Sequence, residues 1–300
     1  MLNQHRSGMT RRSFHRIVAG GAAAWLPQGT APAQAAMIDS KVSGVLIGAQ
    51  SYSFRDRDLD AAIQAMKAVG LGECELYSGH LERLPGGESR DREQLRQWRL
   101  TTPLAEFEAV GKKFRDAGID PYAFNYSFRD DFTDAEIERG FEMAKAIGAK
   151  VITASSNVTT ARRIDPYARK HRIRVGMHNH SRIRENEFAT PDDFAAARKG
   201  MSEYIAINLD IGHFVAAGFD PVEYIKGHHA DILTLHIKDR KKDQGPNVPF
   251  GEGDTPIKEV LALLRDSKYA IPANIEYEYE GEDTVAEVRK CFEYCKQALR

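Results

Sequence analysis

The chain has 300 residues, of which 42 are lysine or arginine and 43 are aspartate or glutamate, and its formal net charge is −1. This balance, with 42% hydrophobic residues, is typical of a globular protein and excludes a collagen-like or low-complexity chain. The charge gives no reason to expect nucleic acid or an anionic membrane surface as a partner.

The first 35 residues differ from the rest. Residues 11–14 read Arg-Arg-Ser-Phe, a modest apolar stretch covers 17–26, and small residues close the segment at 33–35. This three-part layout is typical of a secretory signal, and the paired arginines resemble the twin-arginine export signal. The apolar stretch is too short to span a bilayer. A disordered basic tail is the alternative interpretation.

We therefore expect residues 1–35 to be a signal peptide and residues 36–300 to be the mature domain. Removal of the signal peptide would take away four arginines and no acidic residue, which changes the formal net charge from −1 to −5. The mature protein is then expected in the periplasm or outside the cell, without stable insertion in a membrane.

Beyond the signal, apolar runs of the β type alternate with helical patterns. The strand candidates are 44–50, 73–77, 121–126, 150–155, 174–180, 205–210, 232–238 and 272–278. Helical spacing of apolar residues, with glycines closing the first two segments and a Thr133/Glu136 capping box opening the third, predicts helices within 58–70, 102–118, 133–150, 219–229, 255–267 and 282–300.

Eight strands that are mostly followed by a helix predict a single-domain (β/α)₈ TIM barrel of the α/β class. A doubly wound open sheet is the alternative, but no G-x-G-x-x-G follows the first strand. Two long polar stretches, 83–103 and 239–256, are expected to be loops on the active-site face of the barrel.

Ligand-type side chains gather at the ends of the later strands. Because catalytic groups of such barrels lie at the carboxyl ends of the strands, we expect these residues to converge on one pocket. They are His178 and His180 after the fifth strand, Asp210 and His213 after the sixth, His236 and Lys238 on the seventh, Glu276 and Glu278 on the eighth, with Glu75 on the second.

A set of two histidines, one aspartate and one glutamate suits Mn²⁺, Co²⁺, Fe²⁺ or Zn²⁺ better than Ca²⁺. His178 and His180 are two apart and share a strand face, so either could be the ligand and the other a base. A buried polar network without a metal is the alternative interpretation.

Four motifs carry a resemblance to a known family: VGMHNHS (175–181), NLDIGHF (208–214), LHIKDRK (235–241) and NIEYEYEG (274–281). They resemble the strand-five to strand-eight motifs of the xylose-isomerase-like TIM-barrel superfamily, which includes the sugar phosphate isomerases/epimerases and the family-2 AP endonucleases. The resemblance covers residues 42–300.

The resemblance implies one divalent metal ion, with Mn²⁺ expected first and Co²⁺, Zn²⁺, Fe²⁺ or Mg²⁺ as alternatives. Its implied ligands here are Asp210, His236 and Glu276, together with the strand-five position. Ketose epimerases of the family have a glutamate at that position, whereas this chain has His178. In those epimerases one glutamate removes a proton and a second glutamate returns it from the opposite face. Because one of the two is replaced here, this two-glutamate mechanism is not expected in the same form.

The expected chemistry is removal of a proton next to a carbonyl to give an enediolate, with His180 or Glu276 as the base. His213 and Lys238 are expected to hold sugar oxygens, and Lys238 to balance the enediolate charge. Glu75 is expected either to contact the substrate or to form an ion pair. The apolar wall for a sugar face is expected from Tyr52, Phe54, Tyr77 and Tyr126.

Export favours an unphosphorylated sugar or keto-sugar as the substrate of an isomerase or epimerase. A 3-keto-glycoside lyase or dehydratase that expels a β-substituent is the alternative. An AP-endonuclease-like nuclease is disfavoured by the mature charge of −5, and a non-catalytic sugar-binding barrel by the intact ligand set. A homodimer or homotetramer would be typical of the family.

Overall fold

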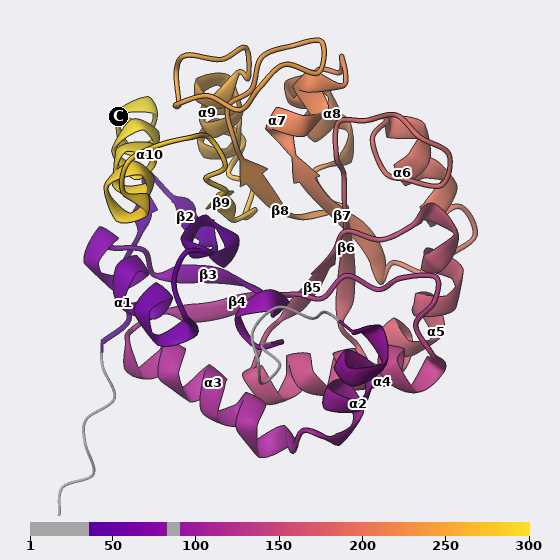
Figure 1. Ribbon diagram of the computed structural model, residues 1–300. Coiled ribbons are helices and arrows are strands. Elements are labelled where there is room, and N and C mark those ends of the chain that lie inside the picture. Colours follow the sequence, from indigo (N-terminus) through magenta and orange to yellow (C-terminus); the bar gives the residue numbers. More distant parts are fainter. Residues whose placement is uncertain (1–35, 83–90) are drawn as a thin grey trace, which may run out of the picture. The chain divides into compact units, whose positions relative to one another are not determined.

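The computed structural model describes residues 36–82 and 91–300, so the predicted export signal at 1–35 lies outside the described residues. Strands β2 to β9 pair in parallel in chain order, and β2 also pairs with β9, which closes the sheet into a barrel (Figure 1). The barrel strands are Val45–Gln50, Glu73–Tyr77, Asp120–Asn125, Val151–Ala154, Arg174–His178, Ile205–Asp210, Ile232–Ile237 and Ala273–Ile275. The additional strand β1, Lys41–Val42, pairs antiparallel with β2.

Helices surround the barrel, and α10 packs beside α1 where the ring closes (Figure 1). In chain order, α1 to α10 cover Leu59–Val69, Arg92–Thr101, Leu104–Asp116, Asp134–Ile147, Ala161–His171, Pro191–Arg198, Ile211–Ala216, Pro221–His228, Ile257–Ser267 and Thr284–Ala298. The predicted (β/α)₈ barrel is confirmed, as is the capping box at the start of α4.

The structure differs from the sequence prediction in the polar stretch 83–103. Its described part contains helix α2 instead of a continuous loop. The α2 sequence is strongly polar, so no apolar stripe announces a helix there. Tertiary ion pairs hold it, because Arg96 and Arg99 on α2 both reach Glu136 on α4. Stretch 239–256 has no helix, as predicted.

The barrel interior changes from apolar to polar along its axis. Ala123, Val151 and Ala206 form part of a small buried apolar cluster. The residues two positions further on β4, β5 and β7 share the same face, and they are Asn125, Thr153 and Asn208. These polar residues lie toward the carboxyl ends of the strands, so the polar end of the interior lies beneath the predicted site.

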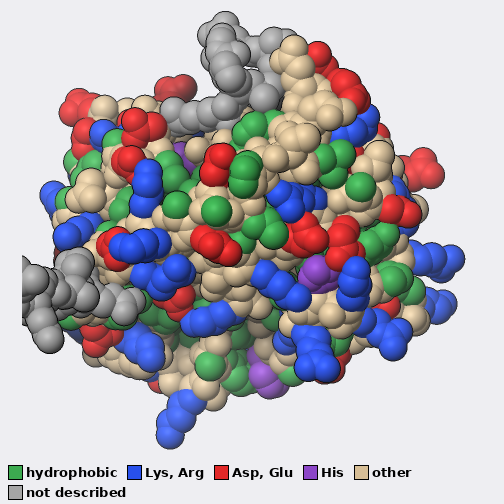
Figure 2. All heavy atoms as spheres, turned by 90° about the horizontal axis from the view of Figure 1, so that it is seen from below, with side chains coloured by type: hydrophobic (Ala, Val, Ile, Leu, Met, Phe, Trp, Pro, Cys, Tyr) green, Lys and Arg blue, Asp and Glu red, His purple; other side chains and the backbone are tan. Residues whose placement is uncertain are grey.

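The surface agrees with the balanced composition. On the face shown in Figure 2, Lys and Arg side chains are interspersed with Asp and Glu side chains. Within the described part of the chain, none of the helices combines the length and the apolar character needed to cross a membrane.

Glu136 connects helices α2 and α4 and is 1% exposed. Its carboxylate accepts hydrogen bonds from the backbone N–H of Thr133 at 2.8 Å and from Arg96 Nε at 2.9 Å, and Arg99 lies 3.3 Å away. Burial alone would raise the pKa of Glu136, but these hydrogen bonds outweigh it and hold the pKa below its ordinary value.

We expect Glu136→Gln to lower the free energy of unfolding at pH 7 by about 2 kcal/mol, because charge-assisted hydrogen bonds are lost. A lowered folded-state pKa stabilises the protein above the unfolded pKa, and this contribution disappears as pH falls through the folded pKa. The difference between variant and parent should therefore shrink in acid. Urea unfolding at pH 7 and pH 3.5 measures it.

Glu142→Gln on the same helix is the matched control. Glu142 pairs with Arg139 at a half-exposed position, so its loss should cost under about 1 kcal/mol. Equal effects of the two substitutions at pH 7 would contradict a special role for Glu136.

Candidate active site

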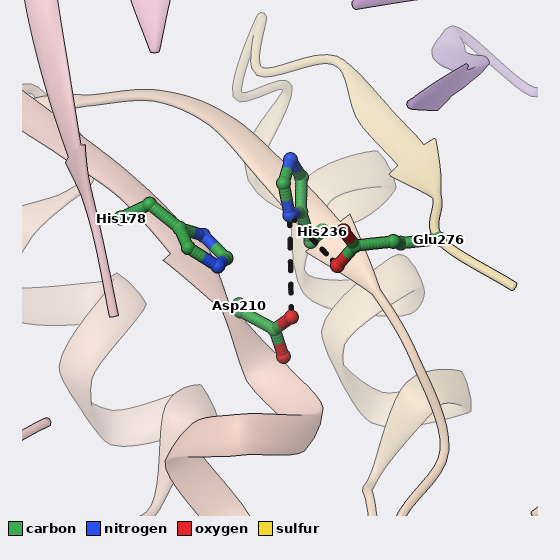
Figure 3. Close-up of side chains that lie close together, drawn as sticks. All are labelled: His178, Asp210, His236 and Glu276. Atoms are coloured by element: carbon green, nitrogen blue, oxygen red, sulfur yellow. Dashed lines mark ion pairs between the residues drawn. The ribbon is translucent and has the colours of Figure 1, made fainter. Parts of the chain in front are cut away.

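Four buried side chains from four consecutive strands of the barrel meet at its carboxyl end. His178 closes β6, Asp210 closes β7, His236 lies on β8, and Glu276 directly follows β9. One ligand-type atom from each lies within 4.8 Å of all the others (Figure 3). We call these four residues the ligand cluster. The predicted convergence of these strand ends is therefore present in the structure.

The ligand cluster concentrates buried nitrogen and oxygen atoms that have few partners. Nδ1 of His178 has no hydrogen bond to the described residues. The other buried donor atoms contact one another and a single ammonium group, since His236 Nδ1 lies 3.1 Å from Glu276 Oε2, and Lys238 Nζ lies 3.0 Å from Asp210 Oδ2 and 2.8 Å from Glu276 Oε2. Two imidazole nitrogens and two carboxylate oxygens are a suitable donor set for a divalent transition metal, and the cluster can hold such an ion.

Lys238 is the cation already present beside the ligand cluster. Its side chain is 2% exposed, and its Nζ lies 3.0 Å from Asp210 Oδ2, 2.8 Å from Glu276 Oε2 and 2.6 Å from Glu278 Oε2. These carboxylates raise the pKa of Lys238 above its ordinary value even though burial lowers it. Lys238 is therefore a charged ammonium group and not a proton acceptor in this arrangement.

Glu75 holds the far side of the His236 ring. Its Oε2 lies 2.9 Å from His236 Nε2, and its Oε1 accepts a 2.7 Å hydrogen bond from Thr153. The other ring nitrogen of His236, Nδ1, lies 3.1 Å from Glu276 Oε2 (Figure 3). Burial lowers the pKa of His236, but Glu75 and Glu276 outweigh it and raise that pKa well above its ordinary value, which favours a proton on both ring nitrogens. A metal ion bound at Nδ1 would replace the proton there, while Glu75 would keep the proton on Nε2.

The charge states of the surrounding groups follow from burial and neighbours. Burial lowers the pKa values of His178, His180 and His213. The positive charge of Lys238 lowers those of His180 and His213 further, so all three rings are neutral near pH 7. Burial raises the pKa of Glu276, but Lys238 and His236 outweigh it and hold that pKa well below the ordinary value. Burial raises the pKa of Asp210 to about 6.

Asp210 is fixed by its neighbours on both sides. Asn179 from the HNH segment donates to the Asp210 carbonyl oxygen at 3.1 Å and accepts from the Asp210 N–H at 2.9 Å. The Asp210 carboxylate caps helix α7 by accepting a 2.7 Å hydrogen bond from the His213 N–H. Asn179 thus ties the end of β6 to the end of β7, and α7 orients the carboxylate.

His213 lies between two cations. Arg240 Nη1 lies 2.7 Å from His213 Nδ1, and Lys238 Nζ lies 3.2 Å from His213 Nε2. A neutral imidazole has one acceptor nitrogen, and the shorter distance assigns that role to Nδ1. Nε2 then carries the proton, and Asp210 Oδ2 lies 3.7 Å from it. Arg240, which the sequence analysis does not single out, thereby fixes the His213 tautomer.

A pocket of about 260 Å³ opens above the ligand cluster. Its size lies just below the usual range for small-molecule sites. Three ligand-cluster members line this pocket, together with other residues of the later strands and a group of residues from the earlier strands. The full lining is Gln50, Tyr52, Tyr77, Asn125, Ser127, Arg129, Ser155, His178, His180, His213, His236, Glu276 and Glu278.

Four residues expected to contact the substrate lie outside the pocket lining, and one of them is Lys238, which is 2% exposed. Phe54 is fully buried in the apolar core, and Tyr126, 1% exposed, stacks there against Phe124. Neither lines the pocket, where the tyrosines of the lining are Tyr52 and Tyr77. Glu75 is also fully buried and lies outside the pocket lining. Of the two expected roles, substrate contact or ion pair, the geometry agrees with the ion pair, which Glu75 forms with His236.

The lining residues missed from the sequence are small or polar side chains from the first four barrel strands. Gln50 ends β2, Asn125 ends β4, and Ser127, Arg129 and Ser155 follow β4 and β5. Their position at or just after strand ends is the signal that could have identified them, by the rule used for the histidines and carboxylates.

The fold and the ligand cluster define a TIM barrel with a candidate metal site at the carboxyl ends of its later strands. Residues 63–297 match the family model described as "Xylose isomerase-like TIM barrel". The chain belongs to this family. The resemblance seen in the strand-end motifs is thereby confirmed.

Curated relatives match over a short stretch. An L-ribulose-5-phosphate 3-epimerase, UlaE, of Escherichia coli is 35% identical over 91 residues, which are 30% of this chain and 32% of that protein. A putative enzyme of the same name from Shigella dysenteriae matches to the same extent. The match thus spans about a third of the length of these relatives.

Solved structures share the fold over most of the chain. The 3-keto-D-glucoside 4-epimerase YcjR from E. coli has a TM-score of 0.64 at 14% identity, covering 84% of this chain and 99% of that one. A sugar phosphate isomerase/epimerase from Parabacteroides distasonis has a TM-score of 0.60 at 20% identity, covering 85% and 95%. The probable 3-DHS dehydratase AsbF from Bacillus anthracis has 0.60 at 15%, covering 82% and 97%.

We expect Glu75→Gln to weaken divalent-metal binding by about 10- to 100-fold, because the carboxylate that orients His236 and strengthens its Nδ1 as a ligand is lost. Isothermal titration of metal-free protein with Mn²⁺ or Co²⁺ measures the affinity. The circular dichroism spectrum should be unchanged, since the amide has the same shape as the carboxylate.

Glu73→Gln is the matched control, two residues earlier on the same strand. Glu73 is 1% exposed, and its two carboxylate oxygens have no hydrogen bond to the described residues. Burial raises its pKa well above the ordinary value, so the neutral amide is a close substitute. Equal loss of metal affinity in both variants would argue against a specific role for Glu75.

Proposed function

We propose that this protein is a divalent-metal-dependent sugar isomerase or epimerase acting on an unphosphorylated sugar or keto-sugar. The observation that carries the proposal is the ligand cluster, in which four buried side chains each offer a ligand atom within 4.8 Å of the others, beside a pocket that also presents His180. Membership of a family whose relatives include named sugar epimerases supports the reaction class.

His178, Asp210, His236 and Glu276 would hold the ion. Neutral His178 and the His236 Nδ1 lone pair supply nitrogen donors, and the carboxylates of Asp210 and Glu276 supply oxygen donors. A divalent ion held there would act as a Lewis acid toward the substrate carbonyl and acidify the neighbouring C–H bond. Mn²⁺ is our first choice for this mixed donor set, with Co²⁺, Zn²⁺, Fe²⁺ and Mg²⁺ as alternatives.

His180 and Glu276 are the proposed proton carriers. Burial and the charge of Lys238 lower the pKa of His180, so its ring is a neutral base near pH 7. Glu276 is ionised in the same pocket. One of them removes the proton next to the carbonyl to give an enediolate, and the carrier that returns it decides the product.

His213 would bind an oxygen of the reacting substrate, whereas Lys238, which is buried outside the pocket lining, would act on it through its charge. The Lys238 ammonium lies within 3.0 Å of two ligand-cluster carboxylates, which is close enough to place positive charge beside an enediolate. His213, with its tautomer set by Arg240, presents an N–H on the same side. These two residues stabilise negative charge, and they exchange no proton in this scheme.

His178 favours a second candidate reaction. This residue occupies the position at which ketose epimerases have a glutamate, so the pocket contains one ionised ligand-cluster carboxylate and one imidazole as proton carriers instead of two glutamates. The same enediolate could expel a β-substituent, with His180 as the acid that protonates the leaving group. A 3-keto-glycoside lyase or dehydratase is therefore our second candidate.

We also propose that residues 1–35 direct export and that the mature protein works in the periplasm or outside the cell. The paired arginines, the apolar stretch and the small-residue end support this proposal. Since phosphorylated sugars are mostly cytoplasmic, export favours an unphosphorylated substrate. A small-molecule sugar is the expected partner, and a homodimer or homotetramer the expected assembly.

We expect the mature protein with Mn²⁺ to introduce deuterium from D₂O next to the carbonyl of a free ketose or a 3-keto-glucoside. An isomerase or epimerase leaves the carbon skeleton intact, whereas a lyase releases the aglycone and leaves an unsaturated keto-sugar. Proton NMR after chelation of the metal identifies the carbon. Absence of exchange and of elimination across the panel would overturn the proposed function.

Substitutions separate metal binding from proton transfer. We expect Asp210→Ala and Glu276→Ala to lose both metal retention and turnover, because each removes a ligand. His180→Ala should retain the metal and lose turnover by about 10²- to 10⁴-fold, the usual contribution of a general base. His229→Ala, on the surface at the end of α8, is the control. Full activity of Glu276→Ala would exclude this site.

A further inference from the structure

The pocket has two chemically different halves. The strands β6 to β9 supply the histidines and carboxylates that the proposed mechanism uses. The opposite half comes from β2 to β5 and consists of aromatic, amide and hydroxyl groups with a single formal charge, that of Arg129. The mechanism proposed above gives no role to Arg129, which nevertheless lines the pocket four residues after the end of β4.

The Arg129 guanidinium is exposed and has no hydrogen bond or ion pair with the described residues. The acids next to it in the chain are engaged elsewhere. Asp130 accepts hydrogen bonds from Thr160 at 2.9 Å and from Asn186 at 3.3 Å, and Asp131 pairs with Arg92. An arginine beside two acids would ordinarily pair with one of them, so this arrangement leaves its five donors available to a ligand.

The carboxylates that line the pocket also have ion-pair partners other than Arg129. Glu276 and Glu278 are both ion-paired with Lys238, at 2.8 and 2.6 Å. Arg129 is therefore a cation at the edge of the pocket without an ion pair to the described residues.

Two hydroxyl groups accompany the guanidinium. Ser127 accepts a 3.2 Å hydrogen bond from the Ser155 N–H, which holds the ends of β4 and β5 together. That contact uses the Ser127 oxygen as an acceptor and leaves its hydroxyl proton available. The Ser155 hydroxyl has no hydrogen bond with the described residues, and both side chains line the pocket.

We propose that Arg129, with Ser127 and Ser155, binds a carboxylate on the substrate, so that the preferred substrate is a sugar acid such as a hexuronate in its keto form. This inference rests on the proposed function and specifies its substrate class. A planar guanidinium binds a carboxylate through two parallel hydrogen bonds. A phosphate dianion would call for a second cation, and Arg129 is the single Lys or Arg among the described pocket residues.

The geometry also places the charged end of the substrate away from the chemistry. Arg129 follows β4, whereas the ligand cluster follows β6 to β9 across the barrel mouth. A six-carbon keto acid could present its carbonyl end to the ligand cluster and its terminal carboxylate to Arg129. Export agrees with such a substrate, because a carboxylate provides an anionic handle without phosphorylation.

Deuterium exchange with matched substrates tests the inference. The panel is D-tagatose, D-tagaturonate and D-tagatose 6-phosphate, together with the corresponding fructose series, and kcat/KM is measured for each. We expect the uronates to be preferred over the neutral ketoses. In Arg129→Gln this preference should fall by about tenfold or more, mainly through KM, as expected for a lost charge-assisted contact.

Arg162→Gln is the matched control, because Arg162 is an exposed arginine on α5 outside the pocket lining. Its preference should stay within about twofold of the parent. Equal exchange of uronates and neutral ketoses, or a preference that survives in Arg129→Gln, would overturn the carboxylate site and leave the proposed function standing. A preference for the phosphates that depends on Arg129 would replace the carboxylate by a phosphate. No exchange with any panel member would overturn both.

Discussion

The organising constraint of the site is surplus negative charge in a buried place. Asp210 and Glu276 are each under 9% exposed, and Glu278 lies beside them, yet Lys238 is the one ammonium group among these three carboxylates. Charged groups are costly to bury without compensation. Lys238 is joined by His236, whose pKa the neighbouring carboxylates raise well above its ordinary value even though burial lowers it. A divalent cation in the ligand cluster would replace the proton on His236 and add positive charge beside the carboxylates, and the donor set of the cluster suits such an ion.

The barrel makes this concentration of charge possible. Parallel pairing sets Asp210 of β7 directly beside His236 of β8, and His178 of β6 beside Asn208 of β7. Side chains that are distant in sequence thus arrive at one end of the barrel in a fixed order. The polar residues of the barrel interior support the ligand cluster from below. Glu75 contacts His236, and Thr153 donates a hydrogen bond to Glu75. The ligand cluster is therefore supported by the strands themselves and not by mobile loops.

Much of this arrangement could be predicted from the sequence, since strand ends carry polar residues and period-two alternation assigns them to one face. The same rules could not place Phe54 and Tyr126, because an aromatic residue just after a strand points into the pocket or into the core according to the turn that follows. Here Phe54 closes a 3₁₀ turn, and Tyr126 donates to the Glu136 carbonyl. Helix α2 was missed because ion pairs to α4 hold it, and such tertiary contacts leave no periodic pattern.

The position of His178 connects the charge constraint to the direction of the reaction. A glutamate at this position would add a negative charge to a cluster whose carboxylates already outnumber the ammonium group beside them. The neutral ring of His178 adds a nitrogen donor and no charge. The exchange also removes one of two symmetrical proton carriers, so the remaining carriers differ in chemistry. Glu276 is ionised and bound to Lys238, while His180 is neutral and lies at the exposed edge of the pocket. In the proposed mechanism the two proton carriers would therefore approach the substrate with different charges and different access to solvent.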